Sequence, residues 1–334
     1  MSLTDLERRY ARWMALFYPA DYRRTRGSEL MDTYLSLAAP DRRRPSPADV
    51  ADLAAGGLRQ RLRAAPGLGA GFRLAGLLAL AITTALASWW AMLLALAPAV
   101  PRYVPTGPVL LLGVAAWVVW LLAAVVHAVA PGRWFRRVAV LALLVTAGVV
   151  PVAMLTGLVR PPLSVLVPQF FLGIVALGAA GRHRWWVRLT PLAAGAVAVP
   201  VAVAAGPRYD GYYITAAFTF PAAGVALLVV VTLLALGLAA RHDHRGVWAL
   251  LILLTPIGML ALNPLGAMLH NSGPGRPIVP VWSAMAAAAL LVAVVGPALL
   301  TLAVAAAGRR SAGGRSRPAA EAYCPTCGAP SNSA

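Results

Sequence analysis

The chain has 334 residues, of which 60% are hydrophobic and 12% are charged, and its mean hydropathy is +0.73. Soluble domains carry roughly 25% charged residues, so this composition excludes an ordinary soluble protein. It also excludes a disordered chain, which combines low hydrophobicity with high charge, and the two cysteines exclude a disulfide framework. The composition therefore predicts an all-α fold, that of a polytopic α-helical membrane protein.

Residues 1–66 predict a small cytoplasmic domain of three amphipathic helices. The segment lacks the short apolar run and cleavage site of a secretory signal peptide, so we expect the N-terminus to stay in the cytoplasm. Capping boxes at 4–7 and 46–49 predict two helix starts, and Pro19 and Pro40 predict two helix ends. A core this small is marginally stable alone, so docking against a partner or the membrane is expected.

One motif in this segment is similar to a known family. It comprises Arg9-Tyr10, the run from Phe17 to Arg23, and Gly27-Ser28-Glu29-Leu30-Met31. It resembles the LYP…R…G-E-E-M signature of actinobacterial integral membrane proteins, with Leu30 where a second acid is expected. Those segments are similar to the HTH-associated α-helical signalling (HAAS-like) domain. A helix stop followed by a turn is the alternative interpretation.

The resemblance implies a signalling module that is tethered to a membrane domain and works with a cytoplasmic regulator of the PadR type. It implies no catalytic residues. The candidate partner-binding residues are Tyr18, Tyr22, Glu29 and Met31.

Residues 67–73, which are rich in glycine, predict a hinge, and 74–307 predict a transmembrane domain. Eight apolar runs there approach the roughly 20 residues that span a bilayer. They cover 74–98, 108–129, 138–158, 164–180, 189–205, 214–240, 247–262 and 281–306. The seventh is short and contains Pro256, so whether it crosses fully is open.

Arginine is unevenly distributed among the loops between these runs. The second, fourth and sixth loops and the tail hold 12 arginines, whereas the other four loops hold one each. Cytoplasmic loops are enriched in basic residues, so the pattern predicts a plasma-membrane protein with eight spans and both termini in the cytoplasm. The net charge of +18 is thus a topology signal, and we expect no direct contact with nucleic acid.

Acidic residues are missing from the predicted spans, and known enzymatic motifs are missing from the sequence. None of the eleven acids falls inside a span, which argues against proton-coupled or sodium-coupled transport. The sequence contains no P-loop, no H-E-x-x-H and no G-x-S-x-G motif, so we expect no enzyme. His127, near the inner end of the second run, is interpreted as an interfacial histidine.

A polar cluster is predicted on the outer face, where the fifth and seventh loops meet. If the fifth and seventh loops come together, Asp210 and His270 pair. The candidate ligand-binding residues are Arg208, Asp210, His270 and Arg276. Interfacial anchoring by the neighbouring tyrosines is the alternative. We expect the seventh loop, which includes 263–266 and 273–275, to be irregular.

The tail, 308–334, is rich in Gly, Ser, Ala, Pro and Arg and is expected to be disordered. Cys324 and Cys327 have the spacing of one zinc knuckle, but a structural zinc site needs four ligands. The alternatives are no metal, or zinc shared across a homodimer or with a partner.

Two functions are compatible with these patterns. The first is a membrane-tethered signalling or regulatory component whose N-terminal helices contact a cytoplasmic partner. The alternative is a permease-like subunit that works with a separate ATPase. In both, the lipid bilayer is one partner and a second membrane protein is a further candidate.

Overall fold

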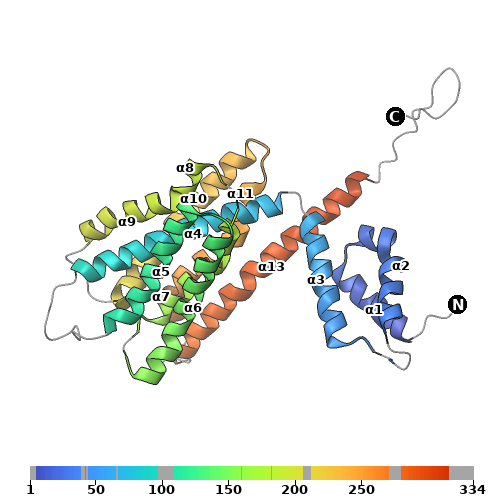
Figure 1. The fold of residues 1–334 in the computed structure, drawn as a ribbon, viewed down its shortest axis with the longest axis horizontal. Coiled ribbons are helices and arrows are strands. Elements are labelled where there is room, and N and C mark those ends of the chain that lie inside the picture. The colour runs from blue at the N-terminus through green and yellow to red at the C-terminus, as the bar shows by residue number, and fades with distance from the viewer. Residues whose placement is uncertain are drawn as a thin grey trace, which may run out of the picture. The chain divides into compact units, whose positions relative to one another are not determined.

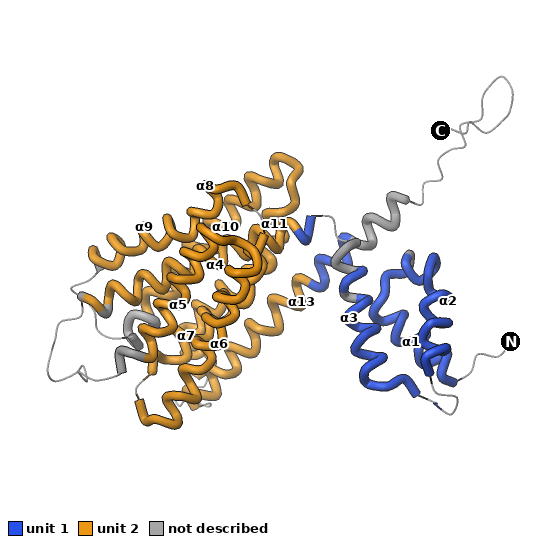
Figure 2. The backbone as a smooth tube through the Cα atoms, viewed as in Figure 1, with its two compact units in different colours: residues 1–69, 301–334 blue, residues 70–300 orange. Residues whose placement is uncertain are grey.

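The computed structural model describes residues 5–38, 42, 44–64, 67–96, 109–158, 160–181, 183–205, 212–270 and 280–315. The chain divides into two compact units (Figure 2). Unit 1 comprises 1–69 and 301–334, and unit 2 comprises 70–300. The described elements are helical throughout, which confirms the all-α class.

Three helices form the N-terminal part of unit 1: α1 (Asp5–Phe17), α2 (Ala20–Leu37) and α3 (Pro47–Ala64) (Figure 1). Helix α1 packs against both α2 and α3. The core residues are Tyr10, Met14, Tyr18 and Leu53, and the partly buried Leu6, Trp13, Phe17, Tyr22, Leu30, Met31, Tyr34 and Leu35 pack around them. The three predicted helices are therefore confirmed, as are the apolar faces predicted for α1 and α2.

The start of α3 confirms one predicted capping box. The Asp49 amide donates to Ser46 Oγ at 3.1 Å, and the Ser46 amide donates to Asp49 Oδ2 at 2.9 Å. Each side chain thus satisfies a backbone donor that the first helical turn leaves unpaired. The other predicted box includes Thr4, which lies outside the described residues.

Unit 2 contains the apolar helices. They are α4 (Leu68–Leu96), α5 (Val109–Val129), α6 (Arg133–Thr156), α7 (Leu163–Ala176) with η1 (Leu177–Ala179), α8 (Trp185–Arg188), α9 (Thr190–Ala205), α10 (Tyr212–Ala239), α11 (Arg245–Gly258), η3 (Met259–Ala261), α12 (Leu262–His270) and α13 (Val281–Arg315). Helix α5 packs on α6, α6 on α7, α7 on α11, and α11 on α10. Helix α4 begins in unit 1 and α13 ends there.

Six helical segments among the described residues are long and apolar enough to cross a membrane. The chain is therefore a multi-pass membrane protein by helix length and composition. The fourth and fifth predicted runs form shorter apolar helices, Leu163–Ala179 and Thr190–Ala204. The seventh run, which we expected to be the least complete, belongs to a segment of 26 residues, Arg245–His270.

The structure corrects two predicted irregular segments. Helix α4 starts at Leu68, so most of the predicted hinge at 67–73 is helical. Within this segment, Gly67 is the residue with a positive φ, 83°. Residues 263–266, predicted as part of an irregular loop, lie in α12. Helix α13 also continues beyond the expected start of the tail at 308, as far as Arg315.

The core of unit 2 is rich in tryptophan and in close helix contacts. Trp90, Trp117 and Trp120 are fully buried, and the rings of Trp90 and Trp117 stack at 6.4 Å. Trp120 Nε1 donates to Thr146 Oγ1 at 3.0 Å, a bond that joins α5 to α6. Packing of this kind fixes how neighbouring apolar helices approach one another.

Candidate functional site

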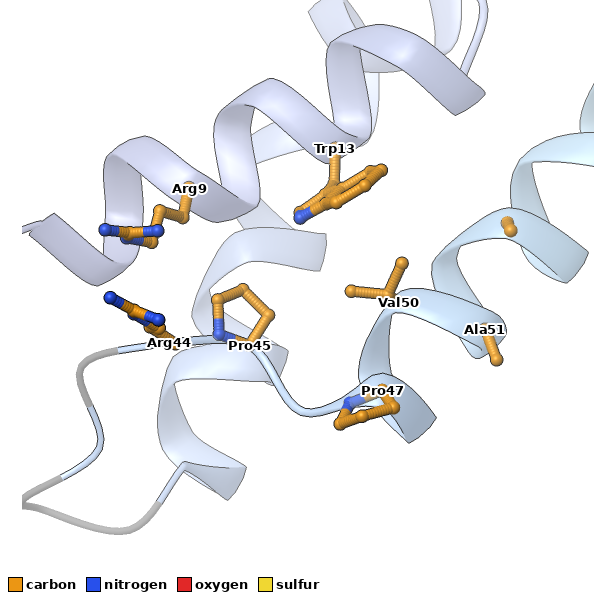
Figure 3. Close-up of a pocket in the computed structure, with 8 residues that line it drawn as sticks. Arg9, Trp13, Arg44, Pro45, Pro47, Val50 and Ala51 are labelled. Atoms are coloured by element: carbon orange, nitrogen blue, oxygen red, sulfur yellow. The ribbon is translucent and has the colours of Figure 1, made fainter.

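An open groove lies between α1 and α3 in unit 1. Its volume is about 480 Å³, and it is lined by Arg9, Trp13, Arg44, Pro45, Pro47, Val50, Ala51 and Ala54. Figure 3 shows the Trp13 ring projecting over the groove toward Val50, with the guanidinium groups of Arg9 and Arg44 close together at one end. We call this feature the α1–α3 groove.

Local sequence makes one wall of the groove rigid. Pro45 and Pro47 flank Ser46, and proline fixes its own φ and disfavours helix at the preceding residue. Pro47 is also the first residue of α3, where its missing N–H costs nothing. The two prolines therefore restrict how the linker approaches α3, and Arg44 lies at the edge of the groove.

Asp49 fixes α1 against this wall. Its Oδ2 accepts hydrogen bonds from the Tyr10 hydroxyl at 2.8 Å and from Arg42 Nη1 at 3.3 Å, as well as from the Ser46 amide. A second bond, from the Tyr34 hydroxyl to Asp52 Oδ2 at 2.5 Å, ties α2 to α3. The three helices are thus held by polar contacts beside their small apolar core.

These contacts also change the acidity of the groups that make them. The backbone N–H of Ser46, opposed in part by burial and aided by Tyr10 and Arg42, lowers the pKa of Asp49. Burial, together with the hydrogen bond to Asp49, raises the pKa of Tyr10 to about 12. Asp49 is therefore ionised and Tyr10 neutral at physiological pH, the states that their hydrogen bond requires.

The groove combines an apolar wall with two cations. Arg42 pairs with Asp49, but no carboxylate among the described residues pairs with Arg9 or Arg44. Guanidinium groups bind carboxylates through paired N–H donors, and an adjacent indole ring offers an apolar contact surface. The chemistry fits a peptide segment that carries both acidic and apolar side chains.

The predicted partner-binding residues lie elsewhere in unit 1. Tyr18 is buried in the core and stacks on Tyr22, with ring centroids 5.2 Å apart, and Met31 packs against the same core. Glu29 is exposed on α2. Three of the four thus stabilise the helices directly, and their contact with a partner stays a prediction.

The predicted outer cluster is largely outside the described residues. Arg208, Asp210 and Arg276 lie there, as do Cys324 and Cys327, so neither the pairing of Asp210 with His270 nor a zinc knuckle is tested. His270 is partly exposed at the end of α12. Within the described part of the chain, no three His, Cys, Asp or Glu side chains are grouped to hold a metal ion.

The lining of the α1–α3 groove was not predicted as a site. The helical period places Trp13 on the apolar face of α1, which favours a core position, and the arginines at 42–44 are typical of a solvated linker. The two prolines around Ser46 were the available signal, because they restrict where the linker can run.

Comparison with protein-family models, with curated proteins and with solved structures finds no match to this chain. The resemblance of the N-terminal segment to the HTH-associated signalling domain therefore depends on its own residues alone.

Proposed function

We propose that this multi-pass membrane protein is a signalling or regulatory component whose N-terminal helical unit binds an acidic segment of a cytoplasmic partner. The α1–α3 groove carries the proposal, because it joins an exposed apolar wall to two arginines that have no carboxylate partner among the described residues. The motif from Arg9 to Met31 nominates a PadR-type regulator as the first partner to test.

The proposal includes the finer topology that the arginine distribution favours. Eight apolar helical segments cross the plasma membrane, including the two shorter ones, and both termini lie in the cytoplasm. This orientation would place the groove where a cytoplasmic regulator reaches it.

Photocrosslinking in cells tests where the partner binds. A photoreactive residue at Ala51, exposed on the groove wall, is expected to crosslink one defined protein. The matched control is Ser28, exposed on α2 outside the groove lining, which is expected to give no such product.

The captured protein is then titrated against the purified full chain. Charge reversal of Arg9 and Arg44 is expected to weaken binding by about 10- to 100-fold each, because a charged hydrogen bond contributes about 1.5–3 kcal/mol. The control, Arg26→Glu on α2, is expected to change affinity by less than about threefold, because solvent screens an exposed charge outside the groove. Equal losses at Arg26 and Arg9, or unchanged binding at all three positions, would contradict the proposal.

A further inference from the structure

A polar cluster lies within unit 2, separate from the groove. It contains Arg73 near the start of α4, His127 near the end of α5, His183 between η1 and α8, and Arg188 at the end of α8. We call it the His127–His183 cluster. Three segments that are distant in sequence bring four basic side chains together there.

His127 is at the buried end of this cluster. Its side chain is 0% exposed, although we interpreted it from the sequence as an interfacial residue. Its ring lies edge-on to Phe135 with centroids 4.9 Å apart, and 6.0 Å from the ring of His183. Neither ring nitrogen of His127 has a hydrogen-bond partner among the described residues.

His183 connects this ring to the two arginines. Its Nε2 is buried and also without a hydrogen-bond partner in the described part of the chain. A Cβ placed on Gly181 would lie 3.4 Å from both His183 Nε2 and Arg73 Cδ, so these two side chains converge over Gly181. Arg188 Nε donates to the His183 carbonyl at 2.8 Å, which holds Arg188 beside the same residue.

Among the described residues, the cluster contains no counter-charge, and three of its imidazole nitrogens have no hydrogen-bond partner. Nearly all buried polar groups in proteins are hydrogen-bonded, and an orphaned one is costly. Three orphaned imidazole nitrogens in one cluster therefore indicate a partner from outside the chain. Among the described residues no carboxylate pairs with Arg73 or Arg188, and two cations disfavour a bound metal cation.

We propose that the His127–His183 cluster binds an anionic phosphate group. Arg73, Arg188 and His183 contact the phosphate, and His127 contacts it from the inner side of the site. Basic pockets between membrane helices bind the headgroups of anionic lipids in this way. A lipid headgroup and free phosphate share this chemistry, and the experiment separates them.

Protonation of His183 gives the site a defined pH dependence. Burial and the charges of Arg73 and Arg188 lower the pKa of the free imidazole, while a hydrogen bond to the Ala179 backbone raises it in part. The groups that face this ring are Arg73, Arg188, His127 and that carbonyl. An anion favours the protonated ring, so affinity increases as pH falls and decreases as pH rises through the pKa of the complex.

The test titrates the full chain, purified in detergent, with short-chain phosphatidylglycerol, short-chain phosphatidylcholine and inorganic phosphate. Phosphatidylglycerol is expected to bind more tightly than the zwitterionic lipid, and Arg73→Gln or Arg188→Gln to weaken it by about 10-fold. The control is Arg184→Gln, an exposed arginine of the same loop, with a change below about threefold.

Each result has a defined meaning. Binding of inorganic phosphate without a preference for phosphatidylglycerol over phosphatidylcholine assigns the site to free phosphate, and preferential binding of phosphatidylglycerol assigns it to the lipid. Equal losses in all three arginine variants, or no binding of any probe, would overturn the proposal. Because the two arginines are partly or fully exposed, the variants should fold, and His183→Gln provides a second check by removing the pH dependence.

Discussion

At the scale of single residues, Asp49 shows which contacts can be predicted from sequence. Its bond with Ser46 is local, so the spacing of the capping box predicts it. The bonds from Tyr10 and Arg42 are not predicted, because they depend on where α1 and the linker lie in the folded unit. The sequence thus predicts where α3 starts, but it does not predict that Asp49 also connects α3 to α1 and to the linker.

Asp49→Ala is expected to loosen α3 and its contact with α1. The Ser46 amide loses the carboxylate that accepts from it in the capping box, and the Tyr10 hydroxyl loses its acceptor; each bond is worth about 1 kcal/mol. Amide hydrogen exchange over 46–57 in the full chain should accelerate by about 10- to 30-fold. Asp32→Ala, at an exposed site on α2, serves as the control and should leave these rates within about twofold.

The same contacts predict how unit 1 responds to pH. The folded-state pKa of Asp49 is lowered, so its stabilisation is present above the ordinary value of about 3.9 and is lost as pH falls through the folded pKa. The pKa of Tyr10 is raised to about 12, so its contribution is lost as pH rises from about 10 toward that value. Hydrogen exchange in Asp49→Asn should lose the acid-dependent acceleration.

Thr146 carries a prediction for the membrane unit. Thr146→Val keeps the volume but removes the acceptor of the buried Trp120 N–H, which costs about 1–3 kcal/mol. Thermal unfolding in detergent should therefore occur at a lower temperature. Thr83→Val is the matched control, because the buried Thr83 hydroxyl only donates to the Ala79 carbonyl within α4. A loss as large at Thr83 would show that burial of the hydroxyl, and not the Trp120 bond, decides the outcome.

At the scale of helices, length and apolarity predict where helices form better than where they break. Each of the eight predicted runs is helical over most of its described residues, because long apolar segments satisfy their backbone groups internally. The glycines of 67–71 and the Asn-Pro-Leu-Gly sequence of 263–266 predict breaks. Gly71 and Gly266 instead lie in helices, against Trp248 and Met285. Close packing by another helix decides these positions, and it is not visible in the local sequence.

Gly76 tests the importance of such close packing. A Cβ there would lie 2.5 Å from the Gly178 carbonyl carbon, and backbone atoms of a packed helix cannot move aside cheaply. Gly76→Ala is expected to separate α4 from η1 and to lower the free energy of unfolding by about 1–3 kcal/mol. The unfolding temperature in detergent should therefore fall. Gly148→Ala, where nothing lies within 4 Å, should be neutral or slightly stabilising because alanine favours helix.

At the scale of the whole molecule, composition predicts a multi-pass helical membrane protein, and six long apolar segments confirm it. The groove was not predicted, because it depends on how an arginine-rich linker and two helices meet. The number of membrane crossings depends on α7 and α9, which are shorter than the six long apolar segments.

Reporter fusions test the topology of the full chain. Fusions after Arg102 and Arg208 should report the outside, and fusions after Arg136 and Arg184 the cytoplasm, since arginine-rich loops stay inside. Opposite sides for Arg136 and Arg184 would contradict the eight-span arrangement, because two crossings separate them.

The shortness of α7 and α9 has a consequence for the surrounding lipid. With a rise of 1.5 Å per residue, Leu163–Ala179 and Thr190–Ala204 measure roughly 25 and 23 Å, less than a hydrocarbon core of about 30 Å. If both segments cross the membrane, as we propose, this hydrophobic mismatch thins the bilayer locally. The segment between these helices contains His183 and the exposed Trp185 and Trp186, so thinning would draw the headgroup layer toward it. Membranes of greater thickness should then bend more sharply around α7 and α9 than around the rest of unit 2.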